Sequence, residues 1–188
     1  MGDLHRIETF IDAFTPLAVR HEPIPFKLRS GVASNWYVDS RAGLSEGQLL
    51  SEAAQLLIES TRDRQYKYDV VAGMGIAGTA LANAIKVAEG IPGVEGNDDE
   101  SLGQRYGYGL HGASVENQRV WMVDDVAMTG SSLIKLLDMI RGAGGEVDQA
   151  DALIDRSKGK VARALGKLGV EFNALLTFSE KDGLLRPV

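Results

Sequence analysis

The chain of 188 residues contains no cysteine and only three histidines. The absence of cysteine excludes disulfides, thiolate metal sites and a cysteine nucleophile. The histidines, His5, His21 and His111, are scattered and do not show the spacing of metal ligands. No apolar run approaches the roughly 20 residues of a membrane span, and the N-terminal residues contain no apolar signal region. We therefore expect a cytoplasmic protein that does not bind membranes.

Basic residues are also in the minority, with 20 Lys and Arg against 26 Asp and Glu and a formal net charge of −6. This balance argues against general affinity for nucleic acid. Apolar residues make up 44% of the chain, which is enough to build a hydrophobic core. At this length we expect one compact domain spanning residues 1–188.

The order of apolar periodicities predicts strands that alternate with helices. Helices are expected over residues 4–19, 45–60, 79–89, 131–141 and 157–168, and strands over 26–31, 36–38, 68–72, 120–123, 150–154 and 174–178. Pro16 is expected to end or kink the first helix, and Ser45 with Gln48 resembles a capping box that opens the second. Residues 91–112 show the least regular pattern. This alternation predicts an α/β fold with a parallel sheet, whose ligands bind beyond the carboxyl ends of the strands.

Residues 120–132 are the most informative segment of the chain. An apolar run, Val120–Val123, is followed by Asp124 and Asp125 and then by a Thr-Gly-Ser-Ser turn. Two adjacent carboxylates after an apolar strand are costly to bury without a function. They can accept hydrogen bonds from vicinal sugar hydroxyls, and the turn amides with the helix dipole can receive a phosphate. The alternative is an ordinary strand-to-helix turn in which Asp125 or Ser131 caps the helix.

A second glycine-rich turn follows the strand at residues 68–72. Its glycines, Gly73, Gly75 and Gly78, match the dinucleotide-binding fingerprint. That fingerprint also needs a second strand ending in an acidic residue about 20 residues on, whereas here the helix leads into an acidic, glycine-rich segment. The other reading of these residues taken alone is a purely structural glycine turn.

Two further segments combine basic and aromatic residues. Residues 26–41 include Arg29, Trp36 and Tyr37, and Asp155-Arg156 follows the strand at residues 150–154. Taken alone, the first segment is a hairpin with exposed basic residues. The second is a strand end with a local ion pair worth under about 1 kcal/mol.

Together these segments resemble the type I phosphoribosyltransferases, with the orotate branch closest, over about residues 26–178. The family pattern is an apolar run, two acids, an apolar residue and a Thr- and Gly-rich turn, and the chain departs from it at Met128, where Thr is usual. The resemblance implies a central parallel sheet flanked by helices, with a small hood. The hood would comprise about residues 1–40 with C-terminal residues, the core about 45–178, and a mobile loop about 94–110.

The resemblance also implies a role for each segment. Asp124 and Asp125 would face the ribose of phosphoribosyl diphosphate (PRPP), the following turn would hold its 5′-phosphate, and the glycine turn with Arg29 its diphosphate. The complete set implied for PRPP is Arg29, Gly73, Met74, Gly75, Gly78, Asp124, Asp125, Val126, Ala127, Met128, Thr129, Gly130, Ser131 and Ser132. The set implied for orotate is Trp36, Tyr37, Thr129 and Arg156. Arginine suits this role because its planar fork matches a carboxylate.

The activity implied is the conversion of orotate and PRPP to orotidine 5′-monophosphate and diphosphate. Mg²⁺ would accompany PRPP without direct protein ligands, and the enzyme would be a homodimer. Asp124, Asp125 and Arg105 would be the catalytic residues. The loop at 94–110 departs from the family because Arg105 is its only basic residue among four acidic ones. One lost charged donor typically costs about 10²–10³ in rate, so a transferase for another nucleobase and a weakly catalytic PRPP sensor remain alternatives.

Overall fold

A seven-stranded sheet forms the centre of the computed structural model, which describes residues 2–27, 31, 33–62, 67–97 and 109–188. The strands are β3 (Val70–Met74), β4 (Gly93–Asn97), β5 (Gly109–Gly112), β6 (Arg119–Ala127), β7 (Glu146–Asp155), β8 (Glu171–Phe178) and β9 (Leu185–Pro187). Their order is β5-β4-β3-β6-β7-β8-β9. The edge strands β5 and β9 pair antiparallel, and all other neighbours are parallel. The predicted α/β class with a mostly parallel sheet is confirmed.

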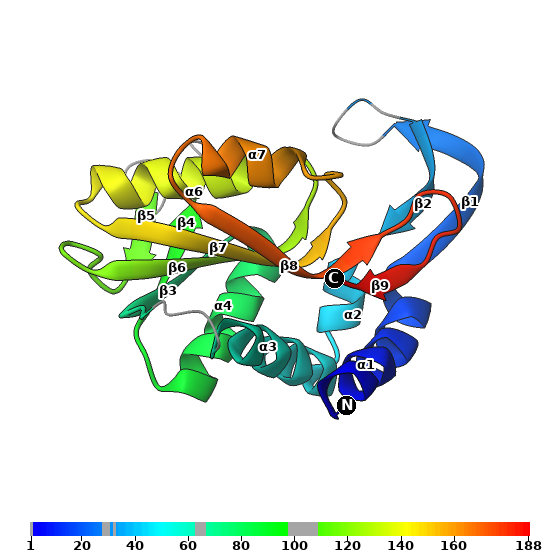
Figure 1. The fold of residues 1–188 in the computed structure, drawn as a ribbon, viewed down its shortest axis with the longest axis horizontal. Helices are drawn as coiled ribbons and strands as arrows, with labels where there is room; N and C mark the ends of the chain where they lie inside the picture. The colour runs from blue at the N-terminus through cyan, green and yellow to red at the C-terminus, as the bar shows by residue number, and fades with distance from the viewer. Residues whose placement is uncertain (1, 28–30, 32, 63–66, 98–108) are drawn as a thin grey trace.

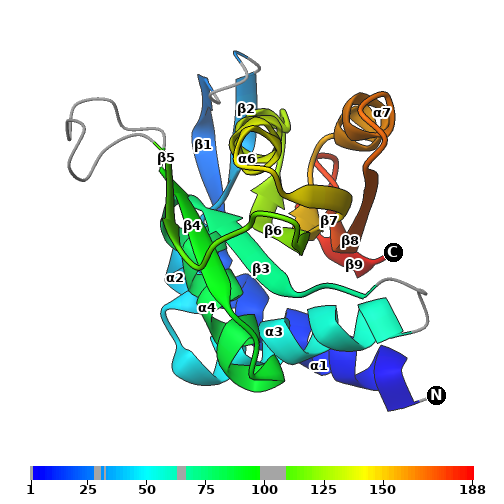
Figure 2. The same ribbon diagram turned by 90° about the vertical axis from the view of Figure 1, so that its left-hand side faces the viewer.

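Helices cover both faces of this sheet (Figures 1 and 2). They are α1 (Gly2–Ala18), α2 (Ser40–Leu44), α3 (Gly47–Arg62), α4 (Gly75–Glu89), α6 (Ser131–Gly142) and α7 (Lys160–Gly166). Alternate strand residues enter two cores: Trp121 and Val123 join the core under α1, α3 and α4, whereas Met122 joins the core under α6 and α7. Burial on both faces explains why these strands read as continuous apolar runs. None of the helices described is long and apolar enough to span a membrane.

A separate antiparallel hairpin stands beyond one end of the main sheet, near β9 (Figure 1). It consists of β1 (Val19–Lys27) and β2 (Ala33–Val38). Pro23 and Pro25 lie in β1, and the pairing register is irregular between His21 and Phe26. Because proline cannot donate to a ladder, its presence fits the irregular stretch of this two-stranded sheet.

The structure corrects two expectations about helix ends. Of the two effects expected of Pro16, an end or a kink, the end is wrong, because α1 continues through the proline to Ala18. Ser45 does not open α3 as an N-cap, because its hydroxyl donates to the carbonyl of Ala42 at 2.7 Å and α3 begins at Gly47; it is instead the C-cap of the short helix that precedes it. The short α2, which the sequence analysis did not predict, occupies the residues just before Ser45.

Candidate functional site at the carboxyl ends of the strands

The glycine turn and the acid pair lie side by side, because β3 and β6 are neighbours with Gly73 in register with Val123. The turn is shorter than expected, since α4 already begins at Gly75, where φ is +72°. A Cβ on Gly73 would lie 2.3 Å from the carbonyl oxygen of Gly78. The first turn of α4 therefore packs directly on β3. This close packing supports a structural role for these glycines.

The acid pair continues β6, which extends to Ala127 and not only to Val123 as expected. Asp124 is 8% exposed, and its Oδ1 accepts a hydrogen bond from the amide of Asp125 at 3.0 Å. Burial and the neighbouring charge of Asp125 raise the pKa of Asp124 well above its ordinary value. Asp125 is only partly buried and accepts a hydrogen bond from Ser40 of α2. No sequence pattern indicates Ser40 as a site residue, because it lies 85 residues from its partner.

The segment after β6 turns sharply into α6. Gly130 is the N-cap with φ +78°, and a Cβ there would lie 3.2 Å from Val161 Cγ2. The N-cap residue is Gly130, which has no side chain to cap with, so the alternative in which Asp125 or Ser131 caps this helix is wrong. The Thr129 hydroxyl instead accepts the Ser131 amide at 3.3 Å. The start of α6 therefore keeps the positive end of its dipole next to the acid pair.

Arg156 follows β7 and is held at the same edge of the sheet, since its amide donates to the carbonyl of Ala127 at 2.9 Å. Its side chain is 2% exposed and its guanidinium lies 4.7 Å from the centre of the Phe178 ring. The guanidinium pairs with Glu180, and Nη2 also donates to the carbonyl of Trp36 at 3.4 Å. The alternative of a local ion pair with Asp155 is wrong, because Asp155 accepts the Ser157 amide at 2.6 Å.

Trp36 and Tyr37 point in different directions from β2. Trp36 packs against Phe178 with ring centres 6.4 Å apart, and Tyr37 packs against Phe26 at 5.9 Å. Successive side chains of a strand face opposite sides. The structure therefore brings Trp36, rather than the ring of Tyr37, toward Arg156, and the assignment of both residues to the orotate site stays a prediction.

Other proteins are similar to this chain in sequence and in structure. The orotate phosphoribosyltransferase of Methanopyrus kandleri is 32% identical over 160 residues, which cover 85% of this chain and 83% of the relative. The chain belongs to the orotate phosphoribosyltransferase family. The orotate phosphoribosyltransferase of Mycobacterium tuberculosis in complex with Fe(III) dicitrate is 26% identical with a TM-score of 0.78, over 94% of this chain and 98% of that chain. Its complex with PRPP gives 26% identity and a TM-score of 0.73 over 92% and 95%. No protein-family model matches the chain.

For this orotate phosphoribosyltransferase family member, two of the expected site residues, Arg29 and Arg105, lie outside the described residues. The other expected residues lie on β2, on β3 with the start of α4, on the end of β6 with the turn into α6, and after β7. Within the part of the chain that the structure describes, no group of three or more His, Asp or Glu side chains could hold a metal ion.

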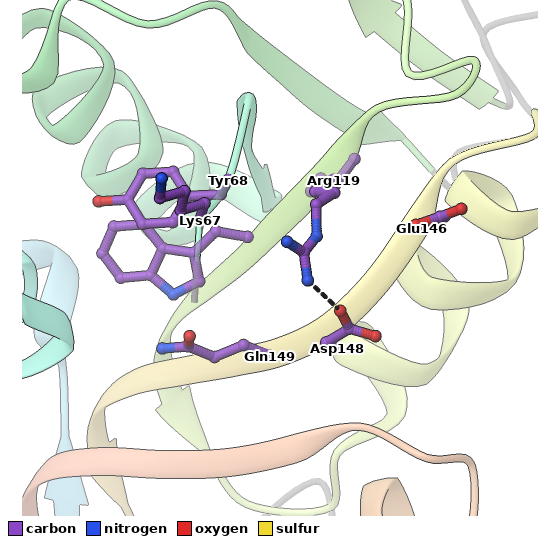
Figure 3. Close-up of a pocket in the computed structure, with 8 residues that line it drawn as sticks. Lys67, Tyr68, Arg119, Glu146, Asp148 and Gln149 are labelled. Carbon is purple, nitrogen blue, oxygen red and sulfur yellow. Dashed lines mark hydrogen bonds and ion pairs between the residues drawn. The ribbon is translucent and has the colours of Figure 1, made fainter. Parts of the chain in front are cut away.

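A small pocket at the opposite edge of the sheet does not belong to this site (Figure 3). Its volume of about 10 Å³ is the size of one water molecule. It is lined by Lys67, Tyr68, Arg119, Val120, Trp121, Glu146, Asp148 and Gln149. These residues lie before or at the amino ends of β3, β6 and β7, away from the acid pair, and Arg119 and Asp148 form an ion pair at 3.2 Å across the pocket.

Proposed function

We propose that this chain transfers the phosphoribosyl group of PRPP to orotate, giving orotidine 5′-monophosphate and diphosphate in pyrimidine nucleotide biosynthesis. The observation that carries the proposal is the buried Asp124 with the partly buried Asp125 at the end of β6, followed by the turn into α6. Membership of the orotate phosphoribosyltransferase family supports the same reaction.

The starts of two helices suit an extended ligand that carries an anionic group at each end. α4 begins after β3 and α6 begins after the adjacent β6, and neither N-cap residue, Met74 or Gly130, makes a side-chain capping bond. Helix N-termini bind anions through their free amides and dipole. PRPP carries a diphosphate at C1′ and a phosphate at C5′. We assign the diphosphate to the start of α4 and the 5′-phosphate to the turn at 129–132, with Asp124 and Asp125 on the ribose hydroxyls between them.

The chain's own residues would act by positioning and by electrostatic stabilisation. As the C1′–O bond breaks, positive charge grows on the ribose near the two carboxylates and negative charge grows on the diphosphate. Asp124 and Asp125 offer too few ligands to hold a metal by themselves, and a Mg²⁺ ion would arrive with PRPP without direct protein ligands. That ion would supply charge neutralisation at the diphosphate. Arg105 is proposed to contribute a further positive charge.

Arg156 is proposed to bind the carboxylate of orotate. A buried guanidinium recognises a carboxylate better than a neutral base edge, because two charge-assisted hydrogen bonds form at once. The neighbouring Trp36 and Thr129 would bound the space for the pyrimidine ring. We further propose that the β1–β2 hairpin and the C-terminal turn together form the hood over this space, within one domain.

We also propose a homodimer. α4 carries two strongly exposed apolar side chains, Ile76 at 76% and Val87 at 78%, which a partner could cover. The cytoplasmic location expected from the sequence stays a prediction. Sedimentation equilibrium of the purified chain should give twice the monomer mass, and a monomer at micromolar concentration would contradict the proposal.

The test of function is diphosphate release from PRPP and Mg²⁺ with orotate, uracil and purine bases in parallel. We expect release with orotate and none in the double variant Asp124→Asn/Asp125→Asn, whose folding is checked by circular dichroism. The acidic composition of residues 94–110 favours one second candidate, a PRPP sensor. Calorimetric binding of PRPP without turnover of any base would favour the sensor over the enzyme.

A further inference from the structure

The guanidinium of Arg156 is already paired with an acid of this chain. Glu180, in the turn between β8 and β9, accepts hydrogen bonds on Oε1 from Arg156 Nε at 3.1 Å and from Nη2. Its second oxygen, Oε2, accepts the hydroxyl of Ser34 at 2.8 Å. The Glu180 carboxylate therefore occupies Arg156, the residue that the proposed function assigns to the carboxylate of orotate.

Arg156 offers no room for a second anion beside Glu180. Its side chain is 2% exposed, and the Phe178 ring lies 4.7 Å from it. The carbonyl of Trp36 takes part of the remaining donor capacity at 3.4 Å. A buried charge without a partner is strongly unfavourable. The carboxylate of a bound base must therefore take the place of Glu180 without leaving the guanidinium unpaired.

Glu180 is placed so that its side chain can leave. The side chain is 31% exposed, although hydrogen bonds hold both of its oxygens. The backbone of its turn is closed by other contacts, from Gly183 N to Ser179 O at 2.8 Å and from Ser179 N to Leu184 O at 3.0 Å. Rotation of the Glu180 side chain into solvent therefore leaves the turn and β9 in place.

We propose that Glu180 is a specificity-determining residue that competes with the carboxylate of the base for Arg156. A base that carries its own carboxylate can replace Glu180 on the guanidinium, whereas a neutral base would have to displace an anion without substituting for it. This inference rests on the proposed function, because it takes orotate as the base. Ser34 then serves to hold Glu180 on Arg156 until the exchange occurs.

The experiment measures the KM for orotate and the KM for PRPP in the wild-type enzyme and in Glu180→Gln, which keeps the shape but removes the charge. We expect the orotate KM to fall on the order of tenfold, the size of a lost charge-assisted competitor, with the PRPP KM unchanged. Glu180→Ala should lower the orotate KM as well. The matched control is Asp182→Asn in the same turn, where Asp182 pairs with Arg186 at 2.6 Å, and it should behave as wild type.

The outcomes separate this inference from the proposed function. If wild-type enzyme turns over orotate but its orotate KM is unchanged or higher in both Glu180 variants, Glu180 orients Arg156 and does not compete, and the inference is overturned alone. If wild-type enzyme releases no diphosphate with orotate, the proposed function fails and the inference fails with it.

Discussion

Replacing Asp124 with Asn should make the protein more stable and less active at the same time. Asp124 is 8% exposed and lies next to a second carboxylate, which raises its pKa well above the ordinary value through burial first and the Asp125 charge second. Asparagine has the same shape and retains an oxygen for the Asp125 amide, now accepted at 3.0 Å. Its amide group can also donate to the Asp125 carboxylate, so a repulsive pair becomes a hydrogen-bonded one.

We expect the free energy of unfolding of Asp124→Asn at pH 8 to rise by about 2 kcal/mol, within the usual range for single substitutions. For a chain of this length that corresponds to a Tm about 4–8 °C higher. The sign with pH follows from the raised pKa. Between the ordinary value of 3.8 and the raised value, the folded state binds more protons than the unfolded state, so wild-type stability falls as pH rises. The gain from Asn should therefore be small near pH 4 and complete above the raised pKa.

Urea unfolding of both proteins at pH 4.5 and pH 8 measures this difference. The control is Asp148→Asn, an exposed aspartate on the neighbouring strand β7, which should change stability by less than about 0.5 kcal/mol. The same Asp124→Asn preparation should lose about 10- to 100-fold in kcat/KM for PRPP, because charge-assisted bonds to the ribose hydroxyls are lost. A destabilised Asp124→Asn protein at pH 8, or an equal gain at both pH values, would refute the reasoning.

Three further substitutions test other parts of the account. Arg156→Ala should raise the orotate KM at least about 10-fold with the PRPP KM unchanged, and steady-state kinetics that show no change would remove Arg156 from the base site. Gly73→Ala should destabilise the fold by about 3 kcal/mol, because its Cβ would lie 2.3 Å from the carbonyl oxygen of Gly78; a wild-type Tm would contradict that packing. Trp121→Phe should lower the free energy of unfolding by about 1–3 kcal/mol, since it removes the buried bond from Nε1 to Asp151 at 2.7 Å, and denaturant titration measures the loss.

Local periodicity predicted the central strands β3, β6, β7 and β8 of the sheet and the helices that cover it, but not the strands β4, β5 and β9. The apolar runs at residues 120–123 and 150–154 lie in β6 and β7, and the amphipathic segment at 131–141 lies in α6. Boundaries were less predictable where tertiary contacts decide them. α4 begins at Gly75 because the absence of side chains on Gly73 and Gly78 lets the helix approach the strand.

Sequence patterns did not predict which side chains form hydrogen bonds with the site residues. Glu180 lies 24 residues from Arg156, and Ser40 lies 85 residues from Asp125. Both separations are far longer than a helical or strand period, so only the packing of α2 and of the C-terminal turn against the sheet brings these pairs together. The difference in orientation between Trp36 and Tyr37 was in principle predictable, because strand alternation places neighbours on opposite faces.

The central claim is that the carboxyl end of β6 and the start of α6 bind the ribose phosphate part of PRPP. A crystal structure of the protein with PRPP and Mg²⁺ tests it most directly. The account predicts ribose hydroxyls within hydrogen-bond distance of Asp124 and Asp125, with the 5′-phosphate on the amides of residues 129–132. Density for PRPP in another part of the molecule, with this edge of the sheet unchanged, would contradict it.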